Sequence, residues 1–276
     1  MTDLSLLSEP YVLTKEQISF YKENSFIKLK NVLTSDILEY FNKVISKQVD
    51  ELNTVQIPLE KRNTYGKAFI QICNLWKQNE KIQKIIFSKR LAQIASDLMQ
   101  VNGVRLYHDQ ALFKEAGGGF TPWHADQYYW PLATDKTTTL WIPLQETPTE
   151  MGPLEFSAGS NKILDGRTLA ISDDSETIIK EKLRIENFKH VVEPFNIGEV
   201  SFHAGWLFHR AGANNTNKHR KVMTTIYMDK NMVLKEPGNE AQKTDWDSWC
   251  PGAEIGKIVN SKLNPVLFEE QLSQLK

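Results

Sequence analysis

The sequence contains little cysteine and no long apolar segment, and these absences narrow the class of protein. Its two cysteines, Cys73 and Cys250, are far apart and belong to no Cys-x-x-Cys pair, so neither a disulfide framework nor a zinc cluster is expected. Each should be an ordinary buried or half-buried thiol. No segment approaches the length of a membrane span, and the first residues lack the charged start and apolar run of a secretory signal. We therefore expect a cytoplasmic protein with no membrane partner.

The chain also lacks an excess of charge of either sign. Lys and Arg number 33 against 34 Asp and Glu, for a formal net charge of −1, and the lysines are scattered along the chain. Nucleic acid is therefore not an expected partner, because proteins that bind it present a basic patch. With 276 residues and 41% hydrophobic content the chain can bury a large core. We expect a single domain over residues 1–276, of undetermined oligomeric state.

Residues 1–100 carry helical patterns and are expected to form a mainly helical scaffold. Thr14 and Gln17 form a capping-box pattern, and the helix that they begin leads into a strand-like segment at residues 25–32. A second helix should begin at Thr34 or Ser35. Its apolar residues repeat with a period of 3.6: Ile37, Leu38, Phe41, Val44, Ile45, Val49 and Leu52. Residues 80–99 favour one or two further helices.

Beyond residue 100 the hydrophobic period changes to that of strands. Alternation of apolar and polar residues predicts strands at residues 104–114, 137–144, 198–204 and 220–229, separated by Gly, Pro and Asn turns. Short strands of this kind favour a mainly β fold of jelly-roll type, a sandwich or barrel, over a βαβ sheet. We expect residues 101–230 to form this core and residues 231–276 to cover it with irregular structure.

The stretch "TPWHADQYYWPL" places His124 and Asp126 one residue apart. At a strand end, residues two apart point to the same side, so the imidazole and the carboxylate can aim at one metal ion. The alternative is a hydrogen-bonded pair on the surface. An Fe(II) site of this type needs a third ligand, usually a second imidazole. Of the distal histidines, His203, His209 and His219, we favour His209, which lies at a strand end before a small-residue turn.

Arg220 is the candidate partner of a cosubstrate. Fe(II) on three protein ligands keeps positions open that a 2-oxo acid can fill, and the far carboxylate of that acid needs a cation deeper in the fold. A guanidinium group binds a carboxylate through two parallel hydrogen bonds. Arg220 follows His209 across one turn. The alternative is a basic surface cluster formed with Lys218, His219 and Lys221.

Three segments carry a family resemblance. "LYHDQALFKEAGGGFTPWHADQYYWPL", "TLWIPLQETPTEMGPLEFSAGSNK" and "FHAGWLFHRAGANNTNKHRKVMTTIYMD" resemble the phytanoyl-CoA dioxygenase family of Fe(II)- and 2-oxoglutarate-dependent oxygenases. The resemblance covers about residues 101–229 and extends to "QICNLW" at 71–76. It implies a double-stranded β-helix, a cupin-like jelly roll, with helices packed outside one sheet. It also implies Fe(II), 2-oxoglutarate and O2 as the cofactor and cosubstrates.

The resemblance assigns roles to individual residues. His124, Asp126 and His209 match the iron ligands, which are also the catalytic centre, and Arg220 matches the anchor of the distal carboxylate. Trp141 and Gln110 match positions beside the cosubstrate. Alternation along residues 137–144 puts Thr139 on the same strand face as Trp141, with core packing as the alternative for Trp141. The family often has Ser or Thr where this chain has Ala211. One hydrogen bond to 2-oxoglutarate is therefore in question.

The expected reaction is hydroxylation, or a related oxidation, of a small organic metabolite, with release of succinate and CO2. A halogenase on the same scaffold is one alternative, although chloride normally takes the place of the carboxylate that Asp126 supplies. A metabolite-binding protein without turnover is a second alternative. A cupin isomerase with Zn or Mn is a third, and such sites usually use more histidines. The identity of the substrate cannot be read from the sequence.

Several residues near the motif are candidates for substrate contact. Tyr128, Tyr129 and Trp130 can form a wall or lid of the pocket, or can be core, and we expect at least one of them to be core. Gln71 and Asn74 are polar residues in an apolar run, with capping of a helix or strand as the alternative. Lys114 is expected to be a solvated lysine at a strand end rather than a partner of a bound acid.

Overall fold

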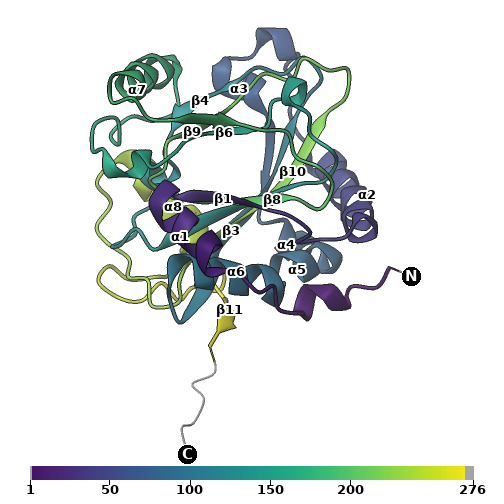
Figure 1. Cartoon of the computed structure of the whole chain (residues 1–276), viewed down its shortest axis with the longest axis vertical. Helices are drawn as coiled ribbons and strands as arrows, with labels where there is room; N and C mark the ends of the chain where they lie inside the picture. Colours follow the sequence, from purple (N-terminus) through teal and green to yellow (C-terminus); the bar gives the residue numbers. More distant parts are fainter. Residues whose placement is uncertain (1, 271–276) are drawn as a thin grey trace, which may run out of the picture.

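Two antiparallel β-sheets pack face to face, with helices on their outer sides (Figure 1). The computed structural model describes residues 2–270. The strands are β1 (Phe26–Leu29), β2 (Ile70–Cys73), β3 (Gly103–Lys114), β4 (Thr121–His124), β5 (Thr137–Pro143), β6 (Leu154–Ser157), β7 (His190–Val192), β8 (Val200–Ala204), β9 (His209–Ala211), β10 (Arg220–Asp229) and β11 (Val266–Glu269). The larger sheet has the order β1-β8-β5-β10-β3-β11, with β2 also paired to β3, and the smaller has the order β4-β9-β6-β7. This arrangement confirms the expected jelly-roll fold.

Helices pack on the outer face of the larger sheet and beside strand β4 of the smaller one. They are α1 (Lys15–Asn24), α2 (Ser35–Leu52), α3 (Thr64–Ala68), α4 (Leu75–Gln78), α5 (Glu80–Ile86), α6 (Lys89–Met99), α7 (Asp173–Ile185) and α8 (Glu240–Trp249), with five short 3-10 helices, η1 (Ser5–Ser8), η2 (Leu59–Lys61), η3 (Asp126–Tyr129), η4 (Thr149–Met151) and η5 (Ser160–Lys162). Helix α6 packs on β3, β5, β10 and β11, whereas α7 packs on β4 (Figure 1). The main hydrophobic core therefore lies between the N-terminal helices and the larger sheet.

The N-terminal predictions are confirmed in detail. The Thr14 hydroxyl accepts a hydrogen bond from the Gln17 amide, and the Gln17 side chain caps the Thr14 amide in return. The second helix begins at Ser35, and five of its predicted apolar residues are buried, while Val44 and Leu52 remain partly exposed. Residues 80–99, for which one or two helices were expected, form two, α5 and α6.

The register of the larger sheet arranges side chains in two rows that face the smaller sheet. Trp141 and Gln110 are the partners of Thr224 on either side of β10. In the next row, Thr139 is paired with both Ile226 and His203, and Ile226 is paired with His108. Paired residues of neighbouring strands share a sheet face, so both rows project into the space between the sheets. This space holds the candidate site.

One prediction about irregular structure is wrong, and one helix was not predicted. Residues 231–270 are not merely irregular, because they contain helix α8 and strand β11, which extends the larger sheet beside β3. The last residues of that predicted segment, 271–276, lie outside the described residues. Helix α7 is also not predicted by the patterns above. Its sequence "DDSETIIKEKLRI" buries only Ser175, Ile179 and Leu183, which is too narrow an apolar stripe to stand out. None of the helices within residues 2–270 has the length and apolar character needed to cross a membrane.

Gly205 fixes the loop that carries Asp126. Its carbonyl accepts a hydrogen bond from the Gln127 amide at 2.9 Å, at the start of η3. A Cβ atom at position 205 would lie 2.8 Å from the Trp130 ring and closer still to the side chains of Gln127 and Thr137. Real side chains do not approach this closely, so only glycine lets the two segments meet here.

We expect Gly205→Ala to lower the free energy of unfolding by about 1–3 kcal/mol, because the added methyl group overpacks the contact with η3. Chemical denaturation followed by tryptophan fluorescence measures the change. Gly238→Ala is the matched control, since the nearest atom to its added Cβ is 3.5 Å away. Equal stability of the two variants would contradict this account of the loop.

Candidate active site

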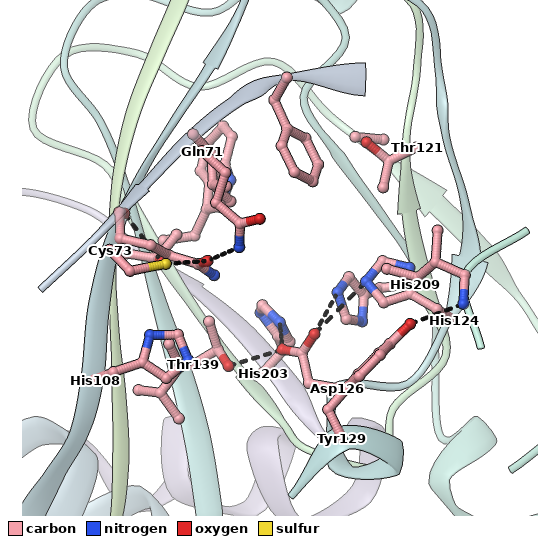
Figure 2. Close-up of a pocket in the computed structure, with 18 of the residues that line it drawn as sticks. Gln71, Cys73, His108, Thr121, His124, Asp126, Tyr129, Thr139, His203 and His209 are labelled. Atoms are coloured by element: carbon pink, nitrogen blue, oxygen red, sulfur yellow. Dashed lines mark hydrogen bonds and ion pairs between the residues drawn. The ribbon is translucent and has the colours of Figure 1, made fainter. Parts of the chain in front are cut away.

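A cavity of about 490 Å³ lies between the two sheets. It is lined by residues of β3, β5, β8 and β10 from the larger sheet, by residues of β4 and β9 from the smaller one, and by η3 and α8. Figure 2 shows Asp126 near its centre, with His124 and His209 on one side and Thr139 and His203 on the other. The larger sheet and the smaller sheet therefore both supply polar groups to one space.

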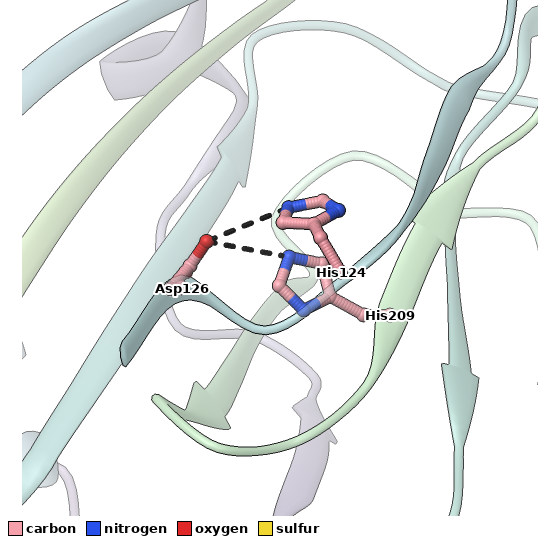
Figure 3. Close-up of side chains that lie close together, drawn as sticks. All are labelled: His124, Asp126 and His209. Carbon is pink, nitrogen blue, oxygen red and sulfur yellow. Dashed lines mark ion pairs between the residues drawn. The ribbon is translucent and has the colours of Figure 1, made fainter. Parts of the chain in front are cut away.

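His124, Asp126 and His209 form a compact group that could hold a metal ion. Each offers one ligand atom, and the three atoms lie within 4.8 Å of one another. His124 Nε2 and His209 Nε2 lie 3.5 Å and 3.7 Å from Asp126 Oδ1 (Figure 3). His124 ends β4 and His209 begins β9, and these two residues are paired in the register of the smaller sheet. Asp126 lies beyond the strand end, in η3, rather than on the strand itself.

The backbone fixes which nitrogen of each histidine faces the group. His124 Nδ1 lies 2.7 Å from the carbonyl oxygen of Pro122, and His209 Nδ1 lies 3.0 Å from that of Leu207. A carbonyl only accepts, so each Nδ1 must be the protonated nitrogen and donate. In a neutral ring held this way, Nε2 carries the lone pair and faces Asp126, which is the form of imidazole that binds a metal.

The second oxygen of Asp126 is held by the larger sheet. Thr139 donates a hydrogen bond to Asp126 Oδ2 at 2.9 Å, and His203 Nε2 lies 3.3 Å from the same oxygen. Oδ1 is thereby left to face the two histidines. His203 thus contacts the carboxylate and is not part of the compact group, while His219 lies outside the cavity and accepts a hydrogen bond from the Ala116 amide.

The electrostatics keep Asp126 charged and His209 neutral. Burial opposes the charge of Asp126, but the neighbouring His209, His124 and His203 outweigh it and hold the pKa of this carboxyl well below its usual range. Burial, with the adjacent His124 and His203, holds the pKa of His209 well below its usual value. An ionised carboxylate beside a neutral imidazole is the protonation state that a divalent metal requires.

Arg220 lies in the same cavity and is not part of a basic surface cluster. It is only 2% exposed, and it donates a hydrogen bond to the Gly152 carbonyl at 2.6 Å. Its buried Nε has no hydrogen-bond partner, and it forms no ion pair with any of residues 2–270. Burial lowers the pKa of Arg220 to about 9, so the guanidinium remains charged at neutral pH. The Trp141 ring lies beside it, with its centre 5.5 Å from the guanidinium carbon.

Lys114 contradicts the prediction of a solvated lysine. It is paired with Arg220 across β3 and β10, is fully buried, and donates a hydrogen bond to the Gly119 carbonyl. Burial and the nearby charges of Arg220 and Arg210 hold the pKa of Lys114 well below its usual value. Its position at the end of a strand does not expose it, because the chain folds back over it at Gly119.

The structure brings most of the predicted cosubstrate and substrate residues into the cavity. Gln110, Gln71, Thr139, Trp141, Tyr129 and Trp130 all line it. The Gln71 amide donates to Gln110 Oε1 at 2.5 Å, and Trp130 also packs in a buried cluster, as expected for at least one of the three aromatic residues. Tyr128 and Asn74 do not line the cavity. Asn74 instead precedes α4 in a left-handed conformation, with φ of 51°.

Ala211 stands opposite a hydroxyl group. It lines the cavity, and its register partner across β4 and β9 is Thr121, which lines the cavity too. Figure 2 shows Thr121 on the same side of the cavity as His209. A hydroxyl is therefore present beside the position where the family often has Ser or Thr, on the neighbouring strand.

Sequence reasoning missed one part of the cavity entirely. Its lining also includes Tyr65, Phe69, His108, Asp245 and Trp249. His108 could have been found from the alternation of β3, which places it on the same face as Gln110. Asp245 and Trp249 gave no such signal, because nothing in residues 231–276 indicates that a helix returns to the cavity.

Comparison with known proteins identifies the family. The model of the family described as phytanoyl-CoA dioxygenase matches residues 9–222. A protein of Stutzerimonas stutzeri named as a probable alpha-ketoglutarate-dependent hypophosphite dioxygenase is 23% identical over 157 residues, or 54% of this chain and 53% of that protein. The chain thus spans about half the length of this curated relative.

Solved structures share the fold over nearly the whole chain. The non-heme alpha-ketoglutarate-dependent carbocyclase SnoK from nogalamycin biosynthesis has a TM-score of 0.76 and 20% identity, with 94% of this chain and 99% of that chain covered. EctD from S. alaskensis, solved with 2-oxoglutarate and 5-hydroxyectoine, has a TM-score of 0.71 and 18% identity, with 94% and 92% covered. At these identities the likeness establishes the fold.

Two histidines and one carboxylate grouped between two sheets are the ligand set typical of the class of non-heme iron proteins with a facial triad. Within that class, the chain belongs to the phytanoyl-CoA dioxygenase family, whose model matches most of its length.

Proposed function

We propose that the protein uses Fe(II), 2-oxoglutarate and O2 to hydroxylate, or otherwise oxidise, a small organic molecule, with release of succinate and CO2. The observation that carries the proposal is the geometry of Asp126. One of its oxygens is held by Thr139 and His203, and the other faces two histidine nitrogens whose rings are fixed by backbone carbonyls.

The donor set fits Fe(II). Two neutral imidazoles and one carboxylate on one side of an ion form the facial triad of non-heme iron oxygenases, which leaves positions open for other ligands. His124, Asp126 and His209 would hold the metal, and His203 and Thr139 would orient the carboxylate. When bound, Fe(II) supplies the redox chemistry that couples decarboxylation of 2-oxoglutarate to oxidation of the substrate.

The residues around Arg220 fit the distal carboxylate of 2-oxoglutarate. The buried Nε without a hydrogen-bond partner and the missing ion pair leave a charge that a bound acid can match. Trp141 would pack beside the cosubstrate, and Gln110 would border it on the neighbouring strand. Thr121 would donate the hydrogen bond that Ala211 cannot. The remaining cavity surface, including Tyr129, Trp130 and Gln71, would hold the substrate and exclude water.

Other features of the proposal rest on the sequence patterns. We propose that residues 1–276 act as one oxygenase domain, in the cytoplasm, on a free small molecule rather than on nucleic acid or a membrane. The balanced charge and the scattered lysines support this view.

We expect His124→Ala, Asp126→Ala and His209→Ala each to weaken metal binding by more than about 100-fold, because a three-ligand site has no spare ligand. His203→Ala should weaken it by about 10- to 100-fold, since it removes a group that orients a ligand. Isothermal titration with Co(II) as a redox-stable probe measures the affinities. His219→Ala, which lies outside the cavity, is the control. Unchanged affinity in His209→Ala would exclude it as a ligand.

We expect Arg220→Ala to weaken binding of 2-oxoglutarate by about 2–5 kcal/mol, because truncating one partner of a buried charge pair leaves the other unpaired. Metal affinity should change little, and Arg220→Lys should restore part of the loss, since lysine keeps the charge but loses the two-pronged geometry. Calorimetric titration of the Co(II)-loaded protein measures both. Lys221→Ala, the adjacent cation, is the control, and an equal loss in it would assign the anchor elsewhere.

The reaction itself is tested by succinate formation. We expect the wild-type protein with Fe(II), ascorbate and 2-oxoglutarate to release succinate at a rate that rises when its substrate is supplied from a metabolite library. The rate should be indifferent to chloride, because Asp126 occupies the position that a halide would need. Mass spectrometry of the product distinguishes the outcomes. A chlorinated product would replace the hydroxylase with a halogenase, and no stimulation by any compound would favour a binding protein.

A further inference from the structure

The C-terminal helix α8 brings a carboxylate to the cavity, far from the Arg220 end. Asp245 lines the cavity, and the Tyr107 hydroxyl donates a hydrogen bond to its Oδ2 at 3.2 Å. The helix is fixed in place because Gln242 donates to the Tyr128 carbonyl at 3.0 Å and Trp249 stacks on His108 with ring centres 4.6 Å apart. The carboxylate, which is partly exposed, is thus part of the cavity wall.

No cation within the described part of the chain balances this carboxylate. Asp245 forms no ion pair within residues 2–270. The neighbouring His108 ring is neutral, because burial lowers the pKa of His108 to about 4. Arg220 begins β10, whereas Ile226, the register partner of His108, lies six residues further along that strand, or about 20 Å at the usual rise. The guanidinium is therefore too distant to compensate Asp245.

Aromatic side chains line the carboxylate end of the cavity. Trp249 stacks on His108 there, and Tyr65 and Tyr129 also line the cavity. Aromatic faces attract cations through the ring quadrupole, and they exclude water from a charge pair formed between them. Burial raises the pKa of Asp245 to about 7, so its charged form carries a desolvation cost that a bound cation would offset.

We propose that Asp245 and the surrounding aromatic residues recognise a protonated amine, and that the substrate of this protein is a small aminated molecule. The inference rests on the proposed function, and it names the substrate class of the same cavity. The ammonium group would pair with Asp245, its carbon skeleton would lie against Trp249 and Tyr65, and the skeleton would place a C–H bond toward the Asp126 end. The acid cosubstrate would then bind at the Arg220 end of the cavity and the amine substrate at the Asp245 end, because the two residues have opposite charges.

The test uses the full chain and a panel of primary amines of graded size, from ethylamine to phenethylamine, each matched with its N-acetyl derivative. Tryptophan fluorescence of the protein loaded with Co(II) and 2-oxoglutarate reports binding. We expect the wild type to bind at least one amine at least about 30-fold more tightly than its acetylated partner, because acetylation removes the charge that pairs with Asp245. A wild type without preference for any amine would overturn the inference.

Asp245→Asn isolates the charge, because the asparagine oxygen still accepts the Tyr107 hydrogen bond. We expect the ratio of amine to N-acetyl affinity to fall to about one in this variant, and Asp245→Glu to recover part of it. Asp247→Asn, an exposed acid on the same helix, removes the same charge and should keep the wild-type ratio. A structural defect in the variant would lower the affinities for the amine and for its N-acetyl derivative together and would not change their ratio. A wild-type ratio in Asp245→Asn would therefore overturn the inference.

The outcome is separable from that of the proposed function. Succinate formation in the wild type with Fe(II), 2-oxoglutarate and the preferred amine tests the oxygenase reaction. Amine preference without succinate would refute the oxygenase and leave the recognition site. Succinate stimulated equally by neutral compounds would refute the recognition site and leave the oxygenase.

Discussion

The structure of the site depends on how the two oxygens of Asp126 are divided between the two sheets. Thr139 and His203, from the larger sheet, hold Oδ2, while Oδ1 faces His124 and His209 from the smaller sheet. A carboxylate that is hydrogen-bonded on one oxygen has a fixed orientation, so the other oxygen is presented in one direction only. Asp126 can occupy this position because Gly205 lets the η3 loop lie against the end of β8 without a side chain between them. Asp126 thus links the two sheets, and the same hydrogen bonds that link them also fix the orientation of its carboxylate.

Much of this arrangement could be predicted from local patterns, because period and capping act over a few residues. Residues close together in the sequence are enough to predict the capping box at Thr14, the apolar stripe of α2, and the alternation of β3 and β10. The grouping of His124, Asp126 and His209 was reached from a motif and a family resemblance, and the register of β4 with β9 explains why two distant histidines meet.

The contributions that could not be predicted come from long-range folding. Lys114 looks like any strand-end lysine, and its burial depends on the chain returning over it at Gly119. Asp245 lies in a segment without a strong apolar stripe, and its place in the cavity depends on the docking of α8 through Gln242 and Trp249. Local sequence patterns carry no information about which distant segment will pack over a charged residue. The Asp245 end of the cavity could therefore not be predicted.

The cavity has a buried arginine at one end and, at the other end, an aspartate whose pKa burial raises to about 7. Keeping either group charged has a cost that a bound ligand of opposite charge offsets. Arg220 remains cationic with an unpaired Nε, and burial together with Arg220 holds the pKa of the neighbouring Lys114 well below its usual value. At the other end, the Tyr107 hydroxyl donates a hydrogen bond to Asp245, and no cation among residues 2–270 pairs with it. A buried charge without a partner is destabilising, whereas the same charge paired in a water-poor site is held strongly. Such a cavity selects ligands by repelling those of the wrong charge as well as by binding those of the right charge. An acid at the Asp245 end or an amine at the Arg220 end would meet a like charge, so each ligand is directed to one end and one orientation.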